Sequence, residues 1–135
     1  MKIGIDLRPL QMGHKFRGIG EVTKQVSNRI IQQGSKDEDV RFVFYEYDGD
    51  DPKELLNLPK DLAYDVVKLG VSPEEDTTAT KGQKVKRTLK HFYGQPINGS
   101  ERSDVFLQFD YAFGVPTNTK TLLIKHDLIP YIFWD

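Results

Sequence analysis

Two groups of residues, one near each end of the chain, could do chemistry on a bound substrate. His126 and Asp127 lie one residue beyond 121–124, a mainly apolar run typical of a buried strand. A histidine in this position can hydrogen-bond a substrate hydroxyl or move a proton near neutral pH. The residues alone equally allow Asp127 to cap the next turn while His126 packs against Trp134. The pair is therefore a candidate catalytic site with a structural alternative.

The second group is a glycine-containing turn near the N-terminus. Arg17, Gly18 and Gly20 come just before a segment with the apolar spacing of an amphipathic helix. Such a turn exposes backbone N–H groups at the positive end of the helix dipole, which suits a phosphate. The spacing does not match a dinucleotide-binding fingerprint, because the third glycine is missing. A plain turn before a helix is the alternative. Glu46, expected at the end of the second strand, could resemble the acidic residue that holds a ribose.

These residues need elements that hold them in place. The hydrophobic pattern predicts strands at residues 2–6, 40–45, 64–69, 103–109 and 119–125. It predicts a long polar loop over 7–18 and helical segments over 20–33, from 51 to about 56, and over 84–93. The second of these helices is expected to have Asp51 as its N-cap and Pro52 as its first residue. We interpret the alternation of strands and helices as an α/β fold, a Rossmann-like, open, mainly parallel sheet flanked by helices.

Parallel strands would bring the two groups together. If the first and last strands run in the same direction, the glycine turn and the His126-Asp127 pair lie at the same edge of the sheet. In open α/β sheets, ligands bind at this edge, where the strands have their carboxyl ends. Asp110 and Tyr111 follow the fourth strand at the same predicted edge. Tyr111 could stack on a sugar ring, and packing inside the protein is equally plausible.

Composition bounds the possible functions. The 135 residues suffice for one domain, expected over 1–135. Nineteen basic and twenty acidic side chains give a net charge of −1, so bulk charge implies no nucleic acid partner. The absence of cysteine excludes disulfides and thiolate chemistry, and no His, Asp or Glu group has metal-ligand spacing. No apolar run reaches the ~20 residues of a membrane span, so cytoplasm is the default expectation.

One predicted helix raises the question of a membrane surface. Residues 84–93 carry basic side chains around an apolar face, with Phe92 and Tyr93 at the end. Such a helix could lie on an anionic membrane, which would place the protein at the inner face of the membrane. A solvated amphipathic helix is the favoured interpretation, since acidic residues 74–76 lie nearby in sequence.

Four stretches together carry a resemblance to a known family. They are Lys2–Leu10 (KIGIDLRPL), Arg17–Gly20 (RGIG), Ser103–Phe106 (SDVF) and Ile124–Pro130 (IKHDLIP). In this order they resemble the N-terminal domain of a family-4 glycosyltransferase of the GT-B fold. Residues 47–100 match only as a pattern of elements.

The resemblance implies an activity and roles for the first two groups. Members of the family transfer a sugar from a nucleotide diphosphate sugar to an acceptor, usually with retention, without a metal and without a further cofactor. By position, Gly18 and Gly20 would approach the donor diphosphate, and Arg17 would add charge. His126 would hydrogen-bond a hydroxyl of the donor sugar, and Asp127 would orient the histidine or its loop.

The resemblance also implies what the chain lacks. Asp110 and Tyr111 would face a glycan or lipid-linked acceptor, which is the role of this domain in the family. The nucleotide sugar would be held mainly by a second domain that this sequence does not supply. We therefore expect an incomplete N-terminal domain of a two-domain enzyme, inactive alone, that builds a surface polysaccharide or glycolipid. The alternatives are a non-enzymatic nucleotide- or phosphate-binding module and an interaction subunit completed by a partner chain.

Overall fold

The computed structural model describes residues 1–16, 18–69, 80–83, 101–110 and 118–124. The predicted helix over 84–93 lies outside these ranges. In chain order the elements are β1 (Lys2–Asp6), α1 (Arg8–Gln11), the 3₁₀-helix η1 (Gly13–Phe16), α2 (Gly18–Gly34), β2 (Arg41–Glu46), α3 (Pro52–Leu55), β3 (Tyr64–Lys68), β4 (Val105–Gln108) and β5 (Lys120–Leu123).

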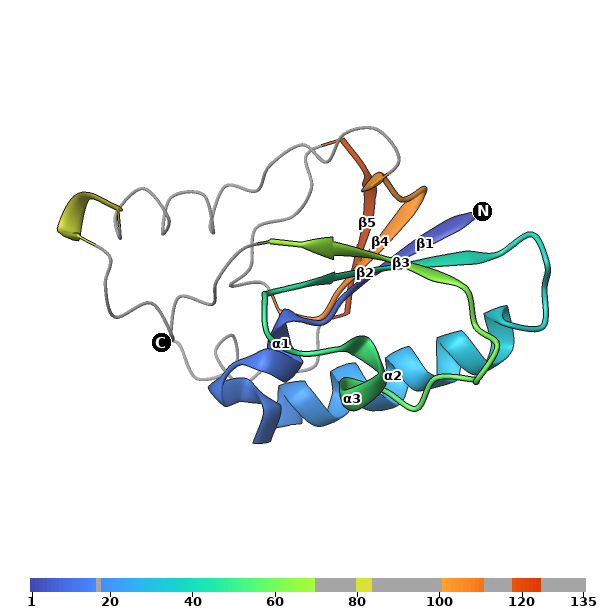
Figure 1. The fold of residues 1–135 in the computed structure, drawn as a ribbon, viewed down its shortest axis with the longest axis horizontal. Coiled ribbons are helices and arrows are strands. Elements are labelled where there is room, and N and C mark those ends of the chain that lie inside the picture. The colour runs from blue at the N-terminus through green and yellow to red at the C-terminus, as the bar shows by residue number, and fades with distance from the viewer. Residues whose placement is uncertain (17, 70–79, 84–100, 111–117, 125–135) are drawn as a thin grey trace, which may run out of the picture.

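The strands form one sheet with β1 at its centre (Figure 1). Their order is β3-β2-β1-β4-β5, and every neighbouring pair is parallel. The prediction of a Rossmann-like α/β fold is confirmed. Parallel strands place their carboxyl ends at one side of the sheet. We call this side the carboxyl edge; it contains the strand ends Asp6, Glu46, Lys68, Gln108 and Leu123.

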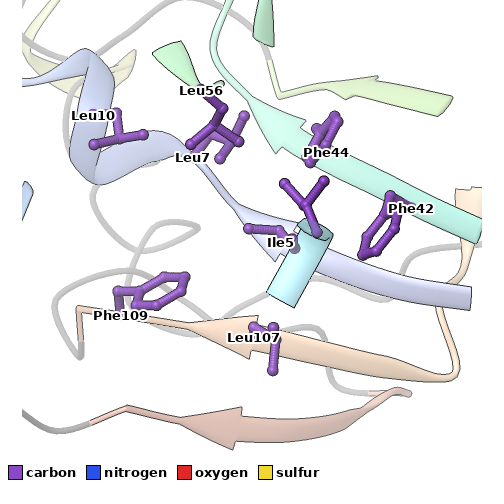
Figure 2. Close-up of a cluster of buried hydrophobic side chains, with 9 residues drawn as sticks. Ile5, Leu7, Leu10, Phe42, Phe44, Leu56, Leu107 and Phe109 are labelled. Atoms are coloured by element: carbon purple, nitrogen blue, oxygen red, sulfur yellow. The ribbon is translucent and has the colours of Figure 1, made fainter. Parts of the chain in front are cut away.

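The main hydrophobic core lies between the sheet and the helices α1, α2 and α3, which cover one face (Figure 1). Alternate residues of β1, β2 and β4 point to this face, because successive side chains of a strand point to opposite sides. Figure 2 shows how side chains from the strands meet those from α1 and from the segment after α3. The buried members are Ile5, Leu7, Leu10, Ile31, Phe42, Phe44, Leu56, Leu107 and Phe109.

The opposite face of the sheet has a smaller cluster, formed by Val43, Tyr45, Val67 and Phe106. The rings of Tyr45 and Phe106 meet edge to face, with centroids 5.0 Å apart. Gly4 faces this cluster. A Cβ atom there would lie 2.5 Å from Ser103 Oγ and 2.7 Å from Tyr45 Cε2, so β1 can approach these side chains only through a glycine.

Residues 8–16 depart from the sequence prediction. The expected polar loop over 7–18 is two short helices, α1 and η1, and α2 begins at Gly18 instead of Gly20. Pro9 lies in the first turn of α1, where its fixed φ favours a helix and its missing N–H has no partner to lose. The backbone N–H of Leu7 donates to Tyr45 O at 2.9 Å, so β2 fixes the start of this segment.

The short helix α3 begins as its sequence predicts. Asp51 is its N-cap, and the Asp51 Oδ1 atom accepts a hydrogen bond from the backbone N–H of Lys53 at 2.9 Å. Pro52 follows in the first turn.

Candidate functional site: the carboxyl edge of the sheet

Buried polar side chains gather where the central strands end. Charged and amide side chains seldom lose nearly all contact with solvent unless they are paired. At the carboxyl edge five of them do, each less than a tenth exposed: Asp6, Arg8, Glu46, Gln108 and Asp110. They are the last residues of β1, β2 and β4 or lie two residues after the end of β1 or β4.

Asp6 and Arg8 form a bidentate ion pair at the end of β1. Arg8 donates from Nε to Asp6 Oδ1 and from Nη2 to Asp6 Oδ2, both at 2.8 Å. The backbone N–H of Arg8 donates to Asp6 Oδ1 at 3.1 Å, which folds the chain into α1. Burial disfavours the charged guanidinium. The Asp6 carboxylate outweighs this effect, with help from Tyr47, and the pKa of Arg8 is raised above its ordinary value.

A second polar contact holds α1 against the chain that leaves β2. The side-chain amide of Gln11 donates from Nε2 to Tyr47 O at 3.0 Å and accepts from the backbone N–H of Tyr47 at 2.7 Å through Oε1. Such a reciprocal pair imitates a strand ladder. Helix α1 is therefore held at both ends, at Arg8 by the ion pair with Asp6 and at Gln11 by the hydrogen bonds with Tyr47.

Glu46 and Lys68 form an ion pair between the ends of β2 and β3, where the two residues are register partners. The Lys68 ammonium also donates to Asp50 O at 3.1 Å. The two side chains differ in solvent exposure: Lys68 is 44% exposed and Glu46 is fully buried. Among the described residues no group hydrogen-bonds the Glu46 Oε2 atom.

The surroundings of Glu46 favour its neutral form. Burial raises the pKa of this carboxyl group above its ordinary value, and the nearby Asp50 and Asp51 carboxylates act in the same direction. The hydrogen bond and charge of Lys68 lower the pKa only in part. Because Glu46 is buried and paired, it joins β2 to β3; a ribose would have to displace these contacts to reach it.

Asp110 is the second residue after β4, the strand between β1 and β5. Its residue is 4% exposed, and its carbonyl oxygen accepts a hydrogen bond from Gln108 Nε2 at 2.8 Å. The predicted acceptor-side residue is thus held at the same edge as the Asp6–Arg8 pair, one strand away. Its partner in that prediction, Tyr111, lies outside the described residues.

The two glycines of the expected phosphate turn lie inside the first turn of α2. Gly18 is exposed, and a Cβ atom added there would meet nothing within 4 Å. Gly20 is buried. Since α2 connects the parallel strands β1 and β2, its N-terminus lies at the carboxyl edge. Its first turn also contains Glu21, whose carboxylate accepts from Gln25 Nε2 at 2.7 Å.

The remaining predicted site residues, Arg17, His126 and Asp127, lie outside the described residues. The structure does describe β5, the strand that leads to the His126-Asp127 pair. β5 runs parallel to β4 and ends at Leu123, and the next backbone N–H, of Ile124, donates to Gln108 O at 2.8 Å. The strand ends before both predicted groups therefore share the carboxyl edge, as the sequence predicts.

Sequence reasoning missed three side-chain contacts at this edge. The Asp6–Arg8 pair carried a local signal, an acid at a strand end followed two residues later by an arginine. The Gln11–Tyr47 and Glu46–Lys68 pairs carried none, since each depends on the pairing of distant strands. In the described part of the chain, no cluster of His, Asp and Glu side chains could hold a metal ion, and no helix there is long and apolar enough to cross a membrane.

Comparisons with models of known protein families, with curated proteins and with solved structures found no match to this chain.

Proposed function

We propose that the chain is the acceptor-side domain of a retaining glycosyltransferase, which moves a sugar from a nucleotide diphosphate sugar to a glycan or glycolipid acceptor. One observation carries the proposal. The carboxyl edge of an entirely parallel five-strand sheet combines the buried Asp6–Arg8 pair, the buried Asp110, and the end of the strand before His126 and Asp127. Asp6 and Arg8, and the pair His126 and Asp127, belong to the stretches that carry the resemblance to the family.

In this proposal the ion pair has a positioning role. Arg8 and Asp6 neutralise each other in a buried place and hold the start of the segment that leads to Gly18. The donor diphosphate would lie near the N-terminus of α2, where the lack of a side chain at Gly18 leaves room for it. Asp110 would accept a hydrogen bond from an acceptor hydroxyl.

Catalysis needs the opposing domain. Only interactions that are stronger in the transition state than in the ground state speed the chemical step, and those on the donor side belong to a second domain in cis. We therefore expect the 135-residue chain to bind substrates weakly and to transfer no sugar alone. Chemistry would depend on His126, as hydrogen-bond partner of the donor sugar, and on Asp127, which would orient it.

A second candidate is a non-enzymatic nucleotide- or phosphate-binding module. The strand order favours it, since Glu46 ends the strand after the first βαβ crossover, where nucleotide-binding folds carry a ribose-binding acid. The burial of Glu46 and its pairing with Lys68 argue against this role.

The test is purification of the native protein from its source, followed by mass spectrometry and a transfer assay with labelled nucleotide sugars. The proposal expects a chain two to three times longer that transfers sugar. NMR titration of the 135-residue chain with inorganic pyrophosphate separates the candidates. A native chain of this length that binds pyrophosphate tightly and transfers nothing would support the module instead.

A further inference from the structure

Phe16 is the most exposed large hydrophobic residue in the described part of the chain. Its exposed fraction is 86%, against 37% to 60% for Met1, Val66, Leu69, Leu122 and Leu123. Single exposed hydrophobic residues are common and need no explanation. The other internal ones lie on or next to the outer strands β3 and β5. Phe16 differs because it ends a 3₁₀-helix that has no strand edge to pair.

The turn that carries Phe16 is held in place. η1 packs against both α1 and α2, and the backbone N–H of Lys15 donates to Met12 O at 2.9 Å. α1 is in turn fixed to β2 by the Gln11–Tyr47 contacts. The exposed ring is therefore presented by a packed turn of the domain.

The sequence next to Phe16 is basic. Between Leu7 and Gly20 the sequence has no acidic residue, while it has Arg8, His14, Lys15 and Arg17. Asp6 neutralises Arg8. Lys15 is exposed, and its ammonium group lies 5.0 Å from the centroid of the Phe16 ring. The η1 turn thus presents an aromatic ring with a cation beside it, and the nearest acidic residue along the chain, Glu21 in the first turn of α2, accepts a hydrogen bond from Gln25.

We infer that the η1 surface, formed by Lys15 and Phe16, docks on an anionic lipid membrane. A bilayer interface supplies both chemistries that this surface needs: an apolar layer for the ring and lipid phosphates for the ammonium group. Aromatic side chains with neighbouring basic residues are typical of segments that bind the interface without crossing it. A soluble anion would satisfy Lys15 and leave the ring in water.

This contact would fix the orientation of the protein. η1 follows the carboxyl end of β1 through α1, so a membrane bound at η1 lies beside the carboxyl edge (Figure 1). The inference does not require the proposed transferase activity. If both hold, a lipid-linked acceptor would reach the edge directly from the bilayer.

The experiment is sedimentation of the 135-residue chain with sucrose-loaded vesicles. One set contains phosphatidylglycerol and phosphatidylcholine in equal parts, and the other contains phosphatidylcholine alone. We expect binding to the anionic vesicles at low salt, little binding to the neutral ones, and release at high salt. Because the readout needs no sugar, failure of the transferase proposal would not affect it.

Matched variants locate the contact. Phe16→Ala should weaken binding to anionic vesicles about tenfold, because a buried ring contributes strongly to partitioning. Lys15→Gln should weaken it severalfold and reduce its salt dependence. The controls are Leu122→Ala, at another exposed apolar side chain, and Lys36→Gln, at another exposed lysine. Unfolding in urea confirms that each variant is folded.

Two results would overturn the inference. The first is a lack of binding to anionic vesicles at low salt by the folded wild-type chain. The second is binding that Leu122→Ala or Lys36→Gln weakens as much as the η1 variants do, which would place the contact elsewhere or make it non-specific.

Discussion

Arg8 contacts both carboxylate oxygens of Asp6 at 2.8 Å, although only one residue separates the two in sequence. The pair is buried, and the backbone N–H of Arg8 adds a third hydrogen bond to the same carboxylate. The charges of Asp6 and Arg8 therefore neutralise each other at the end of β1, and their hydrogen bonds fix the direction in which the chain enters α1.

Breaking this pair should destabilise the fold strongly. Asp6→Asn would leave the Arg8 guanidinium buried without its counter-charge, and we expect the free energy of unfolding to fall by about 3–5 kcal/mol. Unfolding in urea measures this change. Replacing both residues by apolar ones, Asp6→Leu with Arg8→Met, should lower stability less than the sum of the single changes. Additive losses would show that the two side chains do not act as a pair.

Stability should depend on pH through Glu46. The folded-state pKa of this carboxyl group lies above its ordinary value of 4.5, so the folded protein binds the proton more tightly than the unfolded chain does. Its contribution is most favourable at low pH and is lost as pH rises from about 4.5 through the raised pKa.

Glu46→Gln tests this pH dependence, because it removes the ionisation while keeping the shape. Measured by urea unfolding across a pH series, wild type should lose stability relative to Glu46→Gln as pH rises through this window. Glu38→Gln, at an exposed carboxylate, corrects for the change in net charge. A difference that stays constant with pH would contradict the raised pKa.

Gly4 should tolerate no side chain. A Cβ atom in Gly4→Ala would lie under 3 Å from Ser103 Oγ and from the Tyr45 ring, and over-packing of this kind typically lowers stability by about 1–3 kcal/mol. Thermal or urea unfolding checks the value. Gly18→Ala is the matched control, since a Cβ atom there meets nothing and alanine favours a helix. Equal losses in the two variants would point to backbone effects instead of packing.

The sequence predicts those parts of the fold in which local pattern and tertiary packing agree. The buried strand around Phe42 and Phe44 and the Asp51 N-cap of α3 lie where their residues predict them. In α2 the apolar residues Val26 and Ile30 pack only partly buried against the core, while Thr23 and Ser27 are fully buried. Apolar spacing thus gave the helix but not the centre of its buried face.

The site could be predicted only as a set of strand ends. The alternation of strands with helices predicts that β1 and β5 are parallel and both end at the carboxyl edge, and this prediction is confirmed. The α1–η1 segment could not be predicted, because its polar residues have no helical period and its contacts with Tyr47 depend on where β2 ends. The Glu46–Lys68 pair likewise exists only through the register of β2 against β3.

Replacing His126 should slow sugar transfer by the proposed two-domain enzyme. If its imidazole hydrogen-bonds the donor sugar in the transition state, His126→Ala should lower kcat by roughly 100-fold, the lower end for a positioned catalytic group. Steady-state transfer assays measure this change, and the folding of the variant is checked by unfolding in urea. Unchanged kcat would remove His126 from the site and favour its packing against Trp134.

Gly18 separates a phosphate site from a plain helix start. Its exposed position accepts a side chain without contact inside the protein, so neither Gly18→Ala nor Gly18→Val should unfold the domain. If a donor diphosphate lies against the first turn of α2, a branched side chain at Gly18 would block its approach to the backbone N–H groups. Calorimetric titration of the two-domain protein with a nucleotide sugar should then show about tenfold weaker binding for Gly18→Val. Gly18→Ala, with the smaller side chain, should weaken it less. An unaltered affinity in Gly18→Val would show that these glycines only begin the helix, and the diphosphate would have to be bound elsewhere along the carboxyl edge.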